Sequence, residues 1–185
     1  MGEELMFTAF LACSLALMNY FPDSTISTGY YAKLDNRYED RLAVCLEIAQ
    51  AAADNDVDPV LAISVAWVES GYRTDLVSSA GAVGPMQILP KWHCPDGKVE
   101  GCPLIRNGVL VLKKLVNKYG SAREALCHYN GGIKCGKHSR RYAKRVYQLS
   151  MSINRTMQSA IQGISATEPN CGKAYADHHY PDYGE

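Results

Sequence analysis

Apolar residues recur at helical spacing through the middle of the chain. Between residues 37 and 54, one helix face is expected to hold Leu42, Val44, Cys45, Ile48 and Ala52. Asp58-Pro59 supplies the N-cap and first-turn residues of a second helix, which is apolar on nearly all sides and ends near Gly71. A helix that is apolar all round belongs in the middle of a core.

The second half of the chain predicts further helices. Residues 104–119 form one that ends at Gly120, and Ser121 with Glu124 three residues later has the pattern of a capping box for the next. Residues 139–153 form an amphipathic helix, and strand signals are few. The sequence therefore predicts a mainly α domain with little β structure.

Three parts are expected along the chain: an apolar N-terminal segment and connector (1–34), a compact domain (35–155) and a polar C-terminal tail (156–185). The apolar run 5–18 has the length of a signal-peptide core and is shorter than the about 20 residues that span a bilayer. The residues before it are acidic, and Met1 is retained. A signal, an anchor and a docking helix all stay open, and both ends are candidates for attachment to a larger assembly.

The charge of the chain is balanced, with 19 basic and 19 acidic residues. A neutral domain gives no reason to expect a nucleic-acid partner. Residues 134–145 hold six cations and no acid. We interpret this run as a solvated helix face, with a weak attraction to anionic polymers as the alternative.

Seven cysteines are many for 185 residues. Cys94 and Cys102 bracket a turn-rich loop, and Cys127 and Cys135 bracket a glycine-rich one. Such brackets suit local disulfides and an oxidising compartment, although sequence alone leaves the pairing open. There is neither a C-x-x-C pair nor an H-x-x-x-H pair, so we expect no metal and no other cofactor. Cys45, inside a helix, is the best candidate for a free buried thiol.

One acid, Glu69, stands at the end of the apolar helix, after Trp67 and Val68. Burial disfavours a charged carboxylate, and the negative end of the helix dipole acts in the same direction, so its pKa should be raised. A carboxyl group that stays protonated near neutral pH can act as a general acid. The alternative is an ordinary surface glutamate at a helix end.

The residues around Glu69 carry a recognisable pattern. Glu69-Ser70 is followed by S-x-x-G-A-x-G at 78–84, M-Q-I at 86–88 and Pro90. A-L-x-x-Y-N-x-G follows at 125–132, and Y-A-x-x-V at 142–146. Together these segments closely resemble the soluble lytic transglycosylase family, the Slt-type relatives of goose-type lysozyme. Three motifs in the same order make a chance match improbable.

The resemblance implies a lysozyme-like domain that cleaves peptidoglycan between N-acetylmuramic acid and N-acetylglucosamine and leaves a 1,6-anhydro end. Glu69 would be the catalytic acid and base. The residues implied to surround the glycan are Ser78, Met86, Gln87, Tyr129 and Asn130, with Tyr142 nearby. The chain departs from the family at His128, where alanine is usual and which we expect to face solvent, and in the loop after Trp92.

Two other functions stay open at this point. Hydrolytic glycosidases generally use two carboxylates, and Asp75 would be the first candidate to activate water in a goose-type muramidase. A binding or assembly module with a vestigial site is the third reading. Any of these would act on the bacterial envelope or periplasm, either exported or delivered by a phage virion or a secretion system.

Overall fold

The computed structural model describes residues 3–18 and 28–167. The described helices, in chain order, are α1 (Glu3–Met18), α2 (Thr28–Ala53), α3 (Pro59–Ser70), α4 (Pro90–His93), the 3₁₀ helix η2 (Pro95–Gly97), α5 (Leu104–Tyr119), α6 (Ala122–Gly131) and α7 (Lys137–Thr167). Within these ranges the only β pairing consists of two isolated bridges, Val77 with Val83 and Val83 with Ile88. The mainly α prediction is confirmed.

Helix α3 lies at the centre of the core, packed against α1, α2 and α7. Its N-terminus is capped by the Asp58 carboxylate, which accepts hydrogen bonds from the amides of Val60 (2.9 Å) and Leu61 (3.3 Å). Its C-terminus ends at Gly71, whose φ of 61° lets its amide donate to the Trp67 carbonyl. Both predicted ends of the central helix are confirmed.

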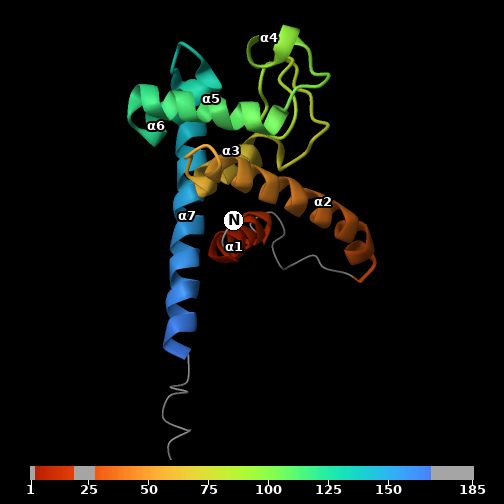
Figure 1. Ribbon diagram of the computed structural model, residues 1–185, viewed down its shortest axis with the longest axis vertical. Coiled ribbons are helices and arrows are strands. Elements are labelled where there is room, and N and C mark those ends of the chain that lie inside the picture. The colour runs from red at the N-terminus through yellow and green to blue at the C-terminus, as the bar shows by residue number, and fades with distance from the viewer. Residues whose placement is uncertain (1–2, 19–27, 168–185) are drawn as a thin grey trace, which may run out of the picture.

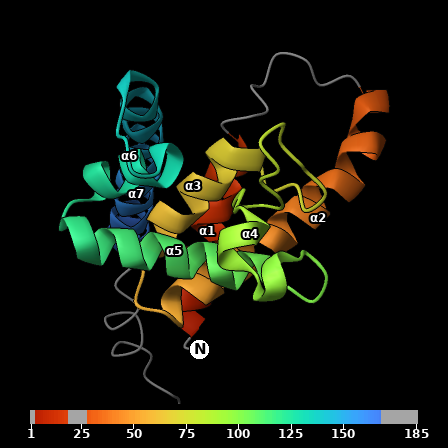
Figure 2. The ribbon, with the colours of Figure 1, turned by 90° about the horizontal axis from the view of Figure 1, so that it is seen from above.

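The N-terminal helix α1 packs on the same core. Figure 1 shows it below α3 and beside α7, and the view from above in Figure 2 shows α3 lying over it. Ala12, Ala16 and Leu17 are buried there, and Cys13 forms a disulfide with Cys45 of α2. The expectation that Cys45 is a free thiol is therefore wrong, because helix packing brings together two cysteines that are 32 residues apart. None of the described helices is long and apolar enough to cross a membrane.

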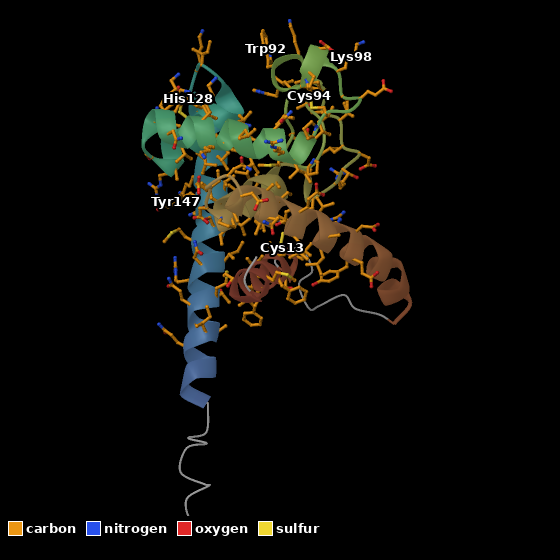
Figure 3. The ribbon with its side chains drawn as sticks, in the orientation of Figure 1. Cys13, Trp92, Cys94, Lys98, His128 and Tyr147 are labelled. Carbon is orange, nitrogen blue, oxygen red and sulfur yellow. A yellow bond between two sulfur atoms is a disulfide. The ribbon has the colours of Figure 1, made fainter. Side chains whose placement is uncertain are left out.

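The two short cysteine brackets form the expected disulfides, Cys94–Cys102 and Cys127–Cys135. Figure 3 shows Cys94 at the same end of the molecule as Trp92, and Cys13 near the opposite side of the core. Cys171 lies outside the described residues. The loops after α4 and α6 are thus covalently closed.

The capping box predicted at Ser121 is wrong in its hydrogen bonds. Ser121 occupies the N-cap position of α6, but its side chain makes no capping bond. Glu124 instead pairs with Arg140 of α7 at 3.4 Å. Tertiary packing of α6 against α7 offers this carboxylate a cation in place of the N-cap amide.

The last helix is longer than predicted, since α7 continues to Thr167 and extends past the other helices in Figure 1. Ile153 and Met157 are both buried, one helical turn apart, within a stretch rich in polar residues. Because this stretch is rich in polar residues, its sequence pattern did not indicate that the helix continues. The tail from residue 168 lies outside the described residues, and the end of the domain near residue 155 stays a prediction.

Candidate active site

Glu69 is the last residue but one of α3 and is half-buried. Burial raises the pKa of its carboxyl group from 4.5 to about 7, while the neighbouring Tyr142 hydroxyl acts in the opposite direction. Desolvation has the larger effect because Glu69 lies at the end of α3, most of whose residues are buried in the core. The site therefore holds a carboxyl group that is partly protonated at neutral pH.

Two tyrosines from later helices lie near this carboxyl group. Burial, and then the charge of Glu69, raises the pKa of Tyr129 in α6 and of Tyr142 in α7 well above the usual value. The Tyr129 hydroxyl donates to the Met86 carbonyl at 2.8 Å. Among the described residues, the Tyr142 hydroxyl is the one buried side-chain polar atom without a well-formed hydrogen bond. It is therefore available to the Glu69 carboxyl group beside it.

Ser70 ties the end of α3 to the loop that follows. Its Oγ donates to the Pro85 carbonyl (2.8 Å) and accepts from the Arg73 amide (3.1 Å). The Met86 carbonyl, next in the chain to Pro85, is the acceptor for Tyr129. The end of α3, the loop and α6 are thus joined by hydrogen bonds close to Glu69 in the chain.

Ser78 and Gln87 stabilise the loop itself. Ser78 Oγ accepts from the Ala82 amide at 3.0 Å. Gln87 Nε2 donates to the carbonyls of Leu76 (3.0 Å) and Gly84 (2.9 Å), and its own backbone has a φ of 48°. Contact of these two side chains with a glycan stays a prediction. Their demonstrated contacts are with the loop backbone.

Met86 is buried, with 1% of the residue exposed, and its contact with a glycan stays a prediction. The side chain packs on Gly108 of α5, where a Cβ atom would come within 2.7 Å of the Met86 Cβ and Sδ atoms. The missing side chain at Gly108 opens the slot that Met86 fills. What Met86 offers the site is its backbone carbonyl.

Tyr129 and Asn130 line a groove of about 750 Å³ between α5, α6 and the α4 loop. Glu69 is not part of the groove lining. Tyr129 is the lining residue that is influenced by the charge of the Glu69 carboxyl group. His128, expected to face solvent, is half-buried in this groove and stacks on Tyr119 with ring centroids 4.1 Å apart. Asp75 is exposed on the loop after α3.

The groove contains residues that the motifs did not indicate: Trp92 from α4, and Lys114 and Lys118 from α5. Figure 3 shows Trp92 and His128 on separate elements, α4 and α6. A signal was present, because Trp92 precedes a cysteine-bracketed loop and the two lysines are one helical turn apart. Sequence spacing alone does not show which helix face borders a groove.

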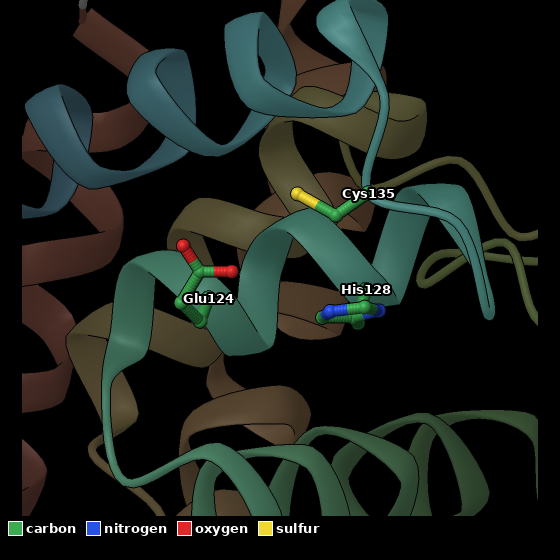
Figure 4. A group of neighbouring side chains, drawn as sticks. All are labelled: Glu124, His128 and Cys135. Atoms are coloured by element: carbon green, nitrogen blue, oxygen red, sulfur yellow. The ribbon is translucent and has the colours of Figure 1, made fainter.

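Glu124, His128 and Cys135 are the described residues best placed to hold a metal ion, with ligand atoms within 4.8 Å of one another (Figure 4). The Cys135 sulfur is, however, bonded to Cys127, and Glu124 pairs with Arg140. His128 Nδ1 lies 2.7 Å from the Gly132 carbonyl oxygen. Each candidate ligand is already engaged, and we assign the cluster no metal.

Comparison with known proteins agrees with this geometry. The transglycosylase SLT domain family matches residues 47–151, more than half of the 185-residue chain. A transglycosylase of Enterobacteria phage PRD1 is 31% identical over 88 residues, which is 46% of this chain and 33% of that protein. The match thus spans about a third of the relative's length, and no solved structure matches the chain. The family match covers Glu69, Tyr129 and Tyr142 together with the mainly α fold around them, and the chain belongs to the transglycosylase SLT domain family.

Proposed function

We propose that this chain is a lytic transglycosylase that cuts peptidoglycan glycan strands between N-acetylmuramic acid and N-acetylglucosamine. One observation carries the proposal. Glu69 lies within the family match, and burial raises its pKa to about 7 beside two tyrosines. A group with this pKa can donate and then accept a proton near neutral pH.

Glu69 first donates its proton to the glycosidic oxygen, so that the bond between this oxygen and C1 of the muramic acid breaks. The Glu69 carboxylate then takes the proton of the C6 hydroxyl of the same sugar. The C6 oxygen bonds to C1, which gives the 1,6-anhydro ring and returns Glu69 to its acid form. The attack is intramolecular, so correct orientation of the sugar supplies much of the rate.

The remaining site residues support this role. Tyr142, whose buried hydroxyl lacks another partner, orients the Glu69 carboxyl group. Tyr129 and Asn130 contact the sugars where the groove approaches Glu69. Ser78 and Gln87 stabilise the loop between α3 and α4 and contact the glycan from this loop.

Mass spectrometry of the soluble products tests the reaction directly. Purified sacculi treated with the enzyme are expected to release muropeptides with 1,6-anhydro ends, because one carboxyl group suffices when the nucleophile is internal. A muramidase that releases reducing ends serves as the control. Ordinary reducing ends would instead assign the chain to the goose-type hydrolases, with Asp75 as the residue to test. An absence of any release in a turbidity assay would leave a binding or assembly module.

The pH dependence of kcat/KM reports the acid form of Glu69. With a pKa of about 7, the protonated fraction declines as pH rises through 7, whereas an ordinary carboxyl group near 4.5 would lose its proton far earlier. We expect kcat/KM to be retained from pH 5 to 6 and to fall about tenfold per pH unit well above the pKa. Enzyme held at each pH and assayed at pH 6 controls for unfolding. A decline that begins near pH 4.5 would contradict the assignment.

We also propose that the chain acts in the bacterial envelope, either exported or delivered by a phage particle. Three disulfides support an oxidising compartment, and the PRD1 relative supports a phage origin. Attachment to a larger assembly would use α1, where Met6, Phe7 and Phe10 are exposed, and the C-terminal tail. Detection of the protein in purified particles would support delivery, and its presence only in a periplasmic fraction would reject it.

A further inference from the structure

The disulfide Cys127–Cys135 lies beside residues of the candidate active site. Cys127 is a buried residue of α6, two positions before Tyr129, and Cys135 is half-buried in the segment that leads into α7. Figure 4 shows Cys135 facing α6, the helix that carries His128. The bond therefore closes the loop in which Tyr129 and Asn130 lie.

The end of α6 depends on this bond for its attachment to the following segment. The helix ends at Gly131, and Gly132 follows with a φ of 61° and a ψ of −129°, which favour glycine. The Gly132 amide donates to the His128 carbonyl at 2.9 Å, which is a contact within the loop itself. The Tyr129 hydroxyl keeps its bond to the Met86 carbonyl without the disulfide. We therefore expect an opened disulfide to loosen the site without unfolding the domain.

A hollow of about 450 Å³ borders Cys135. Besides Cys135 and Gly136, its described lining consists of four cationic side chains, with neither Asp nor Glu among them: Lys137, Arg140, Arg141 and Lys144. Arg140 pairs with Glu124 at 3.4 Å, so the hollow keeps an excess of positive charge. Positive surroundings attract an anionic thiol and stabilise a thiolate as it forms.

The other two disulfides have different surroundings. The bond between α1 and α2 is wholly buried, since neither of its cysteines is exposed. The bond Cys94–Cys102 is half-buried, but the loop that it closes contains two acids, Asp96 and Glu100, and one cation, Lys98. An anionic thiol is therefore expected to open the disulfide at the end of α6 first.

We propose that Cys127–Cys135 is a site of thiol–disulfide exchange with small anionic thiols, and that its opening switches off the lytic site. A thiolate attacks the Cys135 sulfur and forms a mixed disulfide, while the Cys127 sulfur leaves with the electron pair of the broken bond and takes a proton from water. A second thiolate attacks the sulfur of the first thiol and releases Cys135, which is protonated in turn. Two small thiols are thus oxidised to one disulfide as the protein disulfide is reduced to two thiols.

The reverse exchange, with the oxidised form of the same thiol, restores the bond. The chain is then inactive in a reducing compartment and active in an oxidising one. This inference rests on the proposed function, because the activity that is switched is cleavage of the glycan. Cys127 and Cys135 act through the position of Tyr129 and Asn130, and they are positioning residues.

Timed reduction of the full chain tests the exchange site without any assay of cleavage. The protein is exposed to glutathione, which is anionic, or to β-mercaptoethanol, which is neutral, and the new free thiols are alkylated and located by mass spectrometry. We expect glutathione to open Cys127–Cys135 first. Lys137→Gln/Lys144→Gln should reduce the preference for glutathione over β-mercaptoethanol about fivefold, and added salt should also reduce it because exposed charges are screened.

Lys98→Gln/Arg155→Gln is the matched control, because it removes two exposed cations that lie outside the lining of the hollow. This variant should keep the preference for glutathione. An equal loss of the preference in the control would overturn the exchange site in favour of a general effect of charge. Opening of Cys94–Cys102 before the disulfide at the end of α6 would also overturn it.

The switch is tested by following muropeptide release during the same reduction. The rate is expected to fall about tenfold in step with the opening of Cys127–Cys135, because the groups that contact the sugars lose their position, and to recover with oxidised glutathione. Cys127→Ala/Cys135→Ala should show the same loss in oxidising buffer. Cys13→Ala/Cys45→Ala, which removes a disulfide far from the site, should lose more stability and keep the rate.

Two results would overturn the switch. One is a full rate with the disulfide at the end of α6 open, and the other is a rate that follows the opening of a different disulfide. The failure of the proposed function is distinguishable from both, since it appears as an absence of cleavage by the fully oxidised protein. The order in which the disulfides open is measured independently of cleavage.

Discussion

Replacing Glu69 with glutamine is expected to lower the rate of muropeptide release from sacculi by about 10²–10⁴-fold. Glutamine keeps the size and polarity of the side chain but cannot donate a proton to the glycosidic oxygen or take one from the C6 hydroxyl. No other carboxyl group lies within the described site to replace it, since Asp75 is exposed on the loop. Product release quantified by chromatography at pH 6 measures the loss.

Glu47→Gln is the matched control, since Glu47 is an exposed residue of α2. This variant should cleave at the wild-type rate. Activity of Glu69→Gln within tenfold of wild type would contradict the assignment. Activity lost equally in both variants would point to damage of the protein.

The same substitution has a second effect, on stability. Because the pKa of Glu69 is raised in the folded state, protonation of this residue contributes to the free energy of unfolding. The contribution is complete below pH 4.5 and is lost as the pH rises through about 7. At pH 8 the buried charge therefore costs up to about 3 kcal/mol, which glutamine avoids. Urea unfolding should show Glu69→Gln to be at least as stable as wild type at pH 8. Such a result would separate lost chemistry from lost structure.

The features predicted from sequence are those that depend on neighbours along the chain. Asp58 and Gly71 bracket α3 as expected, because capping needs only residues within one turn. The raised pKa of Glu69 follows from the apolar helix that carries it. Two of the disulfides also join cysteines that are only eight residues apart.

The features that sequence could not reveal depend on contacts between distant elements. Met86 fills a slot at Gly108, 22 residues later, so a residue that the sequence motif predicts at the glycan cleft packs in the core. Lys114 and Lys118 border the groove together with residues of the α4 loop, which is bonded to α5 through Asn107. The partner of Cys45 lay in a segment whose packing no local pattern indicates.

The disulfide between Cys13 and Cys45 is expected to be the largest single covalent contribution to stability. It closes a loop of 32 residues, for which the loss of chain entropy in the unfolded state is worth about 3–4 kcal/mol. Cys13→Ala/Cys45→Ala should lower the free energy of unfolding by this amount and the Tm by roughly 10 °C. Alanine suits both positions, since neither side chain is exposed. Urea unfolding and thermal melting in oxidising buffer measure the change.

Cys94→Ala/Cys102→Ala is the control, because it removes a disulfide that spans only eight residues and whose loss should cost about 2.5 kcal/mol. A control that costs as much as the α1 variant would contradict the loop-length argument. Protease sensitivity separates the two ways in which the α1 variant could lose stability. If Ala12, Ala16 and Leu17 hold α1 on the core without the disulfide, the folded variant should resist cleavage at α1 as the wild type does. Rapid cleavage there would show that the disulfide keeps α1 docked in the native state, beyond its effect on the unfolded chain.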